Sequence, residues 1–288
     1  MRCVRLIARR GWGMVRDMKR RMLSARTVVL VMLAACGAVR AVAEGPGSSG
    51  PSTAATARFD GYIAGVEARL DRQHASASGF LVGGADVEAR VRRGELVVEE
   101  VSPAGGAELP GALLHHWRGT AFAPGATAKD FERVMRDFAG YPRVFAPQVM
   151  RASVTGGQGD RVQAVMRVRQ KHVITVVMDV TYNVVFGNSG AGQGWSSSRS
   201  TRVAEIEGTG TAKERMLRPD EEHGFLWRMN TYWSFEERDG GLWMQVESVT
   251  LSRGIPVGLG WAVRPFVESV PRDSLEFTLR ATSAAVRR

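Results

Sequence analysis

The sequence has very little cysteine. Its 288 residues include two cysteines, Cys3 and Cys36, and both lie within residues 1–43. The chain after residue 43 therefore cannot form a disulfide, a thiol nucleophile or a thiolate metal site. Long hydrophobic runs are missing there too, because no segment stays apolar over the roughly 18 residues that a transmembrane helix requires. We expect this part of the chain to be globular and stabilised by packing.

An excess of charge is also missing after residue 43. The whole chain has 39 Lys and Arg against 29 Asp and Glu, a formal net charge of +10. Ten of the basic residues and one acid lie in residues 1–43, which leaves 29 basic against 28 acidic residues and a net charge of +1. A protein that neutralises many phosphates needs a larger positive excess. Nucleic acid is therefore not an expected partner.

Residues 1–43 have the three parts of an export signal. A basic stretch at 19–26 precedes an uncharged, mostly apolar segment at 27–39, and Ala41-Val42-Ala43 is a small-x-small cleavage site. We therefore expect a signal peptide that ends at Ala43 and a periplasmic or extracellular protein. An alternative stays open, because Leu33-Ala34-Ala35-Cys36 resembles a bacterial lipobox. In that case Cys36 would carry a lipid anchor, and membrane contact is expected only through the signal peptide or this anchor.

The chain after the signal divides into three parts. Residues 44–57, rich in Gly, Pro and Ser, are interpreted as a flexible linker. Residues 58–111 are expected to form an additional helix and a β-hairpin. The helix, which ends near His74, is predicted by apolar residues at helical spacing: Phe59, Tyr62, Ile63, Val66 and Leu70. The hairpin is predicted by the alternation of Val87, Ala89 and Val91, the turn at Arg93-Gly94 and the returning strand 96–101.

Residues 112–288 are predicted to form an antiparallel meander closed by a long helix. A first strand runs through 115–122, and a helix follows from residue 127 or 128 to Gly140. Six more strands are expected at 149–154, 161–169, 172–186, 195–207, 225–237 and 241–253. Asp239-Gly240 predicts a tight hairpin between the last two. The final helix covers 258–285, where Pro265 and Pro271 are expected to kink it or split it.

Alternation along these strands predicts one continuous apolar face that is rich in Trp and Met. A long helix could cover this face and leave a cavity, although a filled core is the simpler alternative. The candidate contacts for a bound hydrophobic molecule are Trp117, Met166, Trp227, Met229, Trp233, Met244, Val263 and Phe266. The candidate groups that would orient it are Thr231, Ser248 and His115.

Three stretches resemble one superfamily. They are Tyr141-Pro142-Arg143-Val144-Phe145 after a helix, Leu251-Ser252-Arg253-Gly254-Ile255-Pro256 before the last helix, and the last helix itself with Pro265-Phe266. This order is similar to that of the START and polyketide-cyclase-like (SRPBCC) proteins. The resemblance implies an α+β helix-grip fold, a curved antiparallel sheet wrapped around a long C-terminal helix. It also implies a cavity that binds a lipid, an isoprenoid or quinone, or a polyketide-like molecule.

Catalytic and metal sites find little support in the sequence. His115 and His116 are neighbours on a strand, so their side chains point to opposite faces and cannot bind one metal ion. The serines at 196–200 lack the Gly-x-Ser-x-Gly context of an activated nucleophile. We therefore expect an exported binding protein without a cofactor or catalytic residues. A cyclase- or hydrolase-type enzyme that uses the same cavity is the second hypothesis, and a non-catalytic interaction protein with a filled core is the third.

Overall fold

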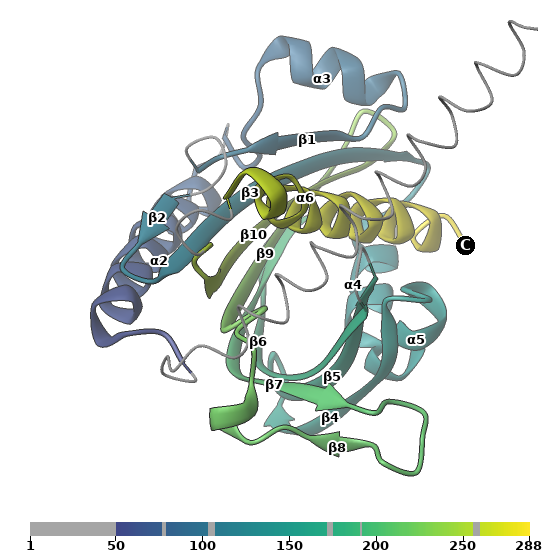
Figure 1. Ribbon diagram of the computed structural model, residues 1–288. Coiled ribbons are helices and arrows are strands. Elements are labelled where there is room, and N and C mark those ends of the chain that lie inside the picture. Colours follow the sequence, from purple (N-terminus) through teal and green to yellow (C-terminus); the bar gives the residue numbers. More distant parts are fainter. Residues whose placement is uncertain (1–49, 77–78, 103–106, 172–174, 191, 256–259) are drawn as a thin grey trace, which may run out of the picture. The chain divides into compact units, whose positions relative to one another are not determined.

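One curved antiparallel sheet organises the fold (Figure 1). The computed structural model describes residues 50–76, 79–102, 107–171, 175–190, 192–255 and 260–288, with the backbone alone for 260–268. All of these residues belong to one unit, Pro46–Arg288. Within them, ten strands form a sheet in the order β1-β3-β10-β9-β7-β6-β5-β4, with β2 also paired to β3 and β8 to β7. The strands are β1 (Val97–Glu100), β2 (Ala107–Leu109), β3 (Ala112–Pro124), β4 (Val149–Gln158), β5 (Arg161–Lys171), β6 (Thr175–Gly190), β7 (Gln193–Glu207), β8 (Arg215–Met216), β9 (Arg228–Arg238) and β10 (Gly241–Arg253).

Side-chain caps mark the start of α2 and of α4. The Ser52 hydroxyl accepts a hydrogen bond from the Ala55 N–H at the start of the first described helix, and Thr127 and Asp130 form a capping box before α4. The α-helices are α2 (Thr53–His74), α3 (Ala85–Arg92), α4 (Ala128–Arg136), α5 (Tyr141–Val144) and α6 (Gly260–Ala285). Short 3₁₀ turns lie at η1 (Phe138–Gly140) and η2 (Pro219–Glu221). None of the described helices has an 18-residue stretch that is apolar enough to cross a membrane.

The predicted meander is confirmed. Each of the paired strands is antiparallel, and Asp239 and Gly240 both adopt positive φ in the hairpin between β9 and β10. Aspartate tolerates this left-handed conformation and glycine adopts it without strain. The predicted helix-grip α+β class is confirmed by this sheet together with the long C-terminal helix.

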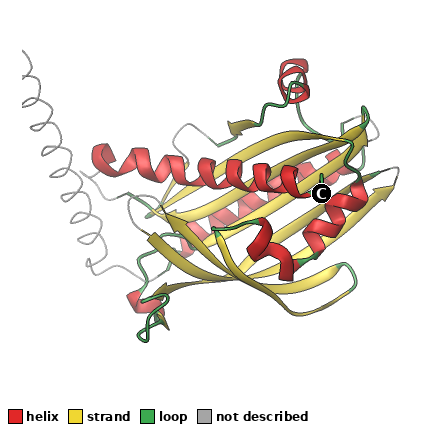
Figure 2. Cartoon of the chain, turned by 90° about the vertical axis from the view of Figure 1, so that its right-hand side faces the viewer, coloured by secondary structure: helices red, strands yellow, loops and turns green. Residues whose placement is uncertain are grey.

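The face of the sheet that packs against α6 is called the inner face here. Figure 2 shows α6 lying across the strands. At Gly119 on β3, an added Cβ would lie 3.1 Å from Leu279 Cδ2 and 3.6 Å from Leu275 Cδ2. The missing side chain therefore allows α6 to approach the sheet closely. On the other side, Gln170 of β5 donates a hydrogen bond of 3.1 Å to the Ser274 hydroxyl of α6. The sheet therefore contacts the helix from two distant strands.

The opposite, outer face of the sheet is covered in part by α2. The predicted stripe of this helix is confirmed, since Phe59, Ile63, Val66 and Leu70 are buried. They pack with outer-face residues of β3, β10 and β9, which are Ala112, Leu114, Val249, Leu251 and Tyr232. The additional N-terminal helix thus shields apolar side chains that the sheet would otherwise expose.

Two predictions about local structure are wrong. Residues 85–92 form the helix α3 instead of a strand. Val87 and Val91 are four residues apart, which fits one helix face as well as a strand face, and both pack near Trp243. The second is the split expected at the prolines of the last helix, since α6 continues through Pro265 and Pro271 as one helix; the alternative of a kink stays a prediction. Burial of Leu275 and Leu279 stabilises the helix despite the hydrogen bonds that the prolines remove.

Candidate functional site

The strands β3, β10 and β9 lie side by side, and their register aligns inward side chains in rows. The first row contains His115, Thr250 and Met229. The second row, two residues further along each strand, contains Trp117, Ser248 and Thr231. We call His115, Trp117, Thr231, Ser248 and Thr250 the polar patch. Directly opposite residues of an antiparallel pair share a face, so these five side chains form one continuous surface.

The next two rows on the same face are entirely apolar. They contain Gly119, Val246 and Trp233, followed by Ala121, Met244 and Phe235. The rings of Phe131 and Phe235 lie 4.4 Å apart, and Leu275 and Leu279 of α6 belong to the same buried cluster. This half of the inner face is filled, since Met244 is 0% exposed and Trp233 is 5% exposed.

The polar patch differs from this filled half because its polar atoms lack partners. His115 is 2% exposed, yet neither ring nitrogen has a hydrogen-bond partner, and the buried Trp117 Nε1 has none either. Across the part of the chain that the structure describes, the hydroxyls of Thr231, Ser248 and Thr250 also form no side-chain hydrogen bond. Buried polar groups in folded proteins nearly always have a partner, so the three buried nitrogens of His115 and Trp117 require an explanation.

The charge state of His115 follows from its surroundings. Burial lowers the pKa of His115 below its usual value, and the nearby Glu100 carboxylate opposes this only in part. The imidazole is therefore neutral at pH 7 and presents one N–H donor and one nitrogen acceptor. Glu100 lies on β1 directly opposite Trp117, so a carboxylate borders the polar patch.

A second carboxylate lies on the inner face at β7. Glu205 pairs with the inward residue Met178 and is buried. Its oxygens accept hydrogen bonds from the backbone N–H of Gly224 at 3.0 Å and of Phe225 at 3.2 Å, and from His223 Nδ1 at 2.7 Å. This carboxylate is fully engaged, and it fixes the loop that leads into β9.

The remaining predicted contacts are distributed differently. Met166 lies on the inner face of β5, packed against the core. Met229 Sδ accepts a hydrogen bond of 3.6 Å from the Tyr182 hydroxyl. The side chains of Val263 and Phe266 lie outside the described part of α6, and Cys36 lies outside the described residues.

The inward placement predicted for Trp227 is wrong. Trp227 packs with the α2 cluster on the outer side, whereas its neighbour Leu226 packs with the inner core. β9 begins only at Arg228, so strand alternation cannot be extended back to these residues.

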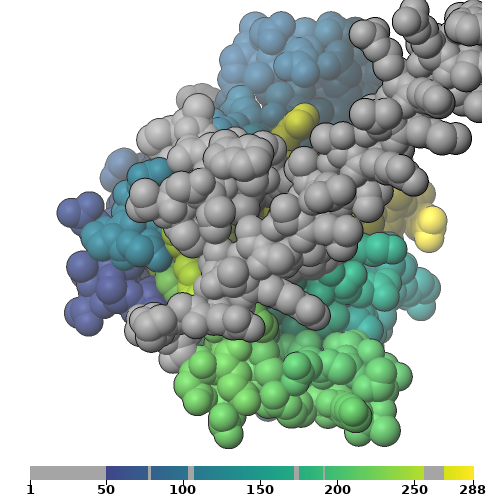
Figure 3. Space-filling view, viewed as in Figure 1, coloured from purple at the N-terminus to yellow at the C-terminus, as the bar shows by residue number. Residues whose placement is uncertain are grey.

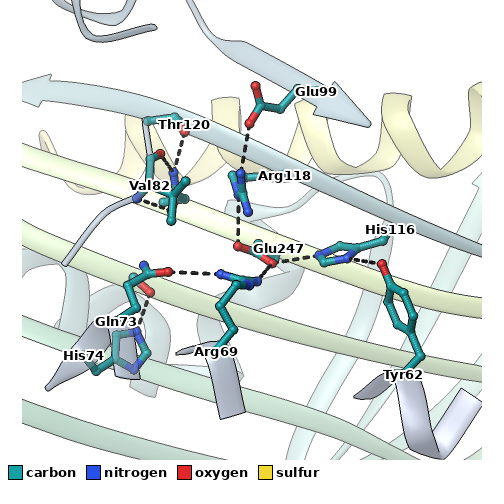
Figure 4. A network of polar contacts seen from close by, with 12 residues as sticks. Tyr62, Arg69, Gln73, His74, Val82, Glu99, His116, Arg118, Thr120 and Glu247 are labelled. Atoms are coloured by element: carbon teal, nitrogen blue, oxygen red, sulfur yellow. Dashed lines mark hydrogen bonds and ion pairs between the residues drawn. The ribbon is translucent and has the colours of Figure 1, made fainter. Parts of the chain in front are cut away.

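His116, which follows His115 on β3, points to the outer face, and both of its ring nitrogens have a hydrogen-bond partner (Figure 4). The buried Glu247 carboxylate accepts hydrogen bonds from His116 Nε2 at 2.7 Å and from Arg118 Nε at 3.0 Å, and it also pairs with Arg69 of α2. The Tyr62 hydroxyl of α2 lies 2.9 Å from His116 Nδ1. We call Tyr62, Arg69, His116, Arg118 and Glu247 the outer-face network.

The outer-face network fastens α2 to the sheet. Burial raises the pKa of Glu247, but the hydrogen bond from His116 and the charges of Arg118 and Arg69 outweigh it and lower the pKa to about 2. Burial and the Glu247 charge raise the pKa of Tyr62. No polar atom of these five side chains is buried without a partner within the described residues, which is the pattern of a structural element.

Sequence reasoning missed this network. Its visible signal in the sequence is Glu247, a charged residue in the middle of the long strand β10. Gln245, two residues earlier on the same face, bonds with the Val82 backbone and with the Thr120 hydroxyl at 3.0 Å. The loop after α2 therefore covers this part of the outer face.

No metal-binding cluster of three or more His, Cys, Asp or Glu is found in the part of the chain covered by the structure.

The short strand β8 pairs with β7, and β8 with its flanking loops forms part of the green surface in Figure 3. Leu217 in this segment is buried, and its N–H donates a hydrogen bond of 2.9 Å to the Glu205 carbonyl, which extends the pairing of β8 with β7.

The sequence matches no protein-family model and no curated protein. Solved structures are similar to it in fold. A STAR-related lipid transfer protein from Xanthomonas axonopodis is 16% identical with a TM-score of 0.41, over 64% of this chain and 97% of that one. The Zhui aromatase/cyclase from Streptomyces sp. R1128 is 13% identical with a TM-score of 0.42, over 61% and 94% of the two chains. Human STARD10 is 8% identical with a TM-score of 0.42, over 72% and 80%.

Proposed function

We propose that this protein binds an apolar small molecule, such as a lipid, an isoprenoid or a polyketide-like compound, between the inner face of the sheet and α6. The observation that carries the proposal is the polar patch. Three buried nitrogens, those of His115 and Trp117, have no partner there, directly beside a half of the same face that is filled and sealed. Small-molecule sites combine apolar walls with a few such orienting groups.

The contrast between the two halves argues against a uniformly filled core. Trp117, Met229, Thr231 and Thr250 face inward but are only partly buried, whereas the corresponding residues of the next two rows are buried. Leu275 and Leu279 seal the filled half. A bound molecule over the polar patch would bury the remaining apolar surface at about 25 cal/mol per Å² before the costs of association.

A cyclase- or hydrolase-type enzyme is the second candidate function, because His115 is a buried ionisable side chain on the inner face. General acid–base catalysis by histidine commonly relies on a neighbouring group that orients the ring. Neither nitrogen of His115 has such a neighbour among the described residues. The geometry therefore favours binding without chemical change.

Export is part of the proposal. The basic stretch, the apolar segment and the Ala41-Val42-Ala43 site support cleavage before Glu44, and Cys36 supports lipidation as the alternative. Mass spectrometry of the protein recovered from the cell envelope and the medium distinguishes the two. A mass that begins at Glu44 supports cleavage, a lipid-bearing mass that begins at Cys36 supports the anchor, and an intact chain in the cytoplasm contradicts export.

Native mass spectrometry followed by organic extraction tests the binding function. The protein is purified without detergent, and the released molecules are identified. An apolar compound at near-unit stoichiometry is expected. Conversion of that compound to a new product during incubation would favour the enzyme instead. A clean mass together with no uptake from a panel of lipids, isoprenoids and aromatic polyketides would contradict binding.

A further inference from the structure

The polar patch also indicates the chemistry of the ligand, given that the proposed function is correct. The neutral His115 ring offers one donor and one acceptor, and Trp117 Nε1 offers a second donor. The hydroxyls of Thr231, Ser248 and Thr250 can each donate and accept. A ligand group that both donates and accepts a hydrogen bond would satisfy more of these atoms than one that only accepts.

The charges on the inner face argue against an anionic head group. Glu100 and Glu205 lie on this face, at β1 and β7 on either side of the strands that bear the polar patch. The described strand residues that face inward include no Lys or Arg, because the arginines of β5 and β7 alternate to the outer face. A carboxylate or phosphate placed here would lose its hydration without gaining a cation from the described strands.

A cationic head group is also disfavoured. Glu205 is already engaged with His223 and two loop N–H groups, and Glu100 accepts a hydrogen bond of 3.3 Å from the Ser102 hydroxyl. The buried polar atoms of the polar patch that lack partners belong to the uncharged side chains of His115 and Trp117.

We infer that the ligand carries an uncharged hydroxyl group on an apolar body, and that His115 and Trp117 bind this hydroxyl at the polar patch. A carbonyl group would satisfy the donors but not the acceptor nitrogen of His115, so it would bind second best. An alkane would leave every atom of the patch without a partner. A carboxylate would be excluded by its charge.

A matched series of twelve-carbon compounds tests this order. Dodecan-1-ol, dodecan-2-one, dodecane and dodecanoate compete with the neutral fluorescent probe N-phenyl-1-naphthylamine for the full chain. Dodecanol is expected to bind about tenfold more tightly than dodecane, which corresponds to the net gain from one or two buried hydrogen bonds. Dodecanone is expected between them, and dodecanoate is expected to be the weakest.

Two variants identify the residues responsible. In His115→Phe the preference for dodecanol over dodecane should fall to less than twofold, while dodecane still binds. Thr250→Val removes one hydroxyl of the patch at constant shape and should reduce the preference partially. Thr181→Val, on the outer face of β6, is the matched control and should keep the full preference.

Side-chain ¹H–¹⁵N spectra give a readout that a purely structural role would not change. Dodecanol should shift the ring nitrogens of His115 and leave those of His116, on the other face, unchanged. Equal binding of dodecanol and dodecane by the wild-type protein, or tightest binding of dodecanoate, would overturn this inference while leaving the proposed function intact. Failure to bind the probe and all four compounds would overturn both.

Discussion

His115 and His116 are consecutive residues of one strand, and they have opposite hydrogen-bonding environments. His116 faces α2 and lies between the Tyr62 hydroxyl at 2.9 Å and the Glu247 carboxylate at 2.7 Å. His115 faces α6, is equally buried, and has no partner for either nitrogen within the described residues. Strand alternation alone thus separates a side chain that stabilises the fold from one that is free to bind a ligand.

Glu247→Gln should strongly destabilise the protein. The carboxylate is 2% exposed and pairs with Arg69, Arg118 and His116, so its removal leaves two guanidinium groups without their shared partner. We expect the free energy of unfolding to fall by about 3 kcal/mol in urea denaturation. The matched control is Glu99→Gln, which removes only the half-exposed partner of Arg118 and should cost less than about 1 kcal/mol. A Glu247→Gln variant as stable as the control would contradict the structural role of the network.

The stability of the protein should fall in two steps as the pH is lowered. Burial lowers the pKa of His74 from 6.5 to about 4. A base with a lowered pKa in the folded state contributes stability above pH 6.5, and this contribution decreases as the pH falls towards about 4. The pKa of Glu247 is lowered from 4.5 to about 2, so its contribution is present above pH 4.5 and decreases towards about 2.

Urea denaturation between pH 7 and pH 3 separates the two groups. In His74→Gln the decrease between pH 6.5 and 4 should become shallower, while the decrease below pH 4.5 remains. In Glu247→Gln the decrease in stability below pH 4.5 should become shallower, while the decrease between pH 6.5 and 4 remains. His74 stacks on Trp195 with ring centroids 5.7 Å apart, and its Nε2 lies 2.7 Å from the Ser234 hydroxyl, so the fluorescence of that tryptophan can report the change locally. An unchanged pH profile in His74→Gln would show that another group titrates in this range.

Gly119→Ala should disturb the contact between α6 and the sheet. The new methyl group would lie 3.1 Å from Leu279 Cδ2 and 3.5 Å from Val246 Cγ1, both in the filled half of the inner face. We expect a loss of about 1–3 kcal/mol in thermal or urea unfolding. Gly61→Ala is the control, because an added Cβ there meets nothing within 4 Å on an exposed helix surface. That variant should be more stable than the wild type by about 0.5–1 kcal/mol. If Gly119→Ala also stabilised the protein, the methyl group would fit without a clash, and α6 would have to lie further from β3 than it does in the structure.

The two-residue alternation of apolar and polar side chains made it possible to predict which face of the sheet a strand residue occupies. Alternation on β3, β9 and β10 placed His115, Thr231 and Ser248 on one face, and it placed His116 on the other. The same reasoning failed at Val87 and Val91, where a spacing of four residues fits helix and strand alike. It also failed at Trp227, which lies just outside the regular strand. Arg69 and Glu247 are 178 residues apart, and no local pattern links them.

The unpartnered atoms of His115 lead to a prediction that is opposite in sign to those above. In the protein without a ligand, a buried imidazole without hydrogen bonds lowers the stability of the folded state. His115→Phe keeps an aromatic ring of similar size and removes both nitrogens. We therefore expect the ligand-free variant to be more stable than the wild type by about 1 kcal/mol in urea denaturation.

The same variant should lose the additional stability that a hydroxyl-bearing ligand gives the wild type, since it can no longer bind the hydroxyl. His116→Phe is the control on the neighbouring position, and it should be destabilised with or without a ligand because it breaks the contacts to Tyr62 and Glu247. If His115→Phe instead destabilises the ligand-free protein as much as His116→Phe does, then His115 has a structural partner. The polar patch would then belong to the core and would not be a binding surface.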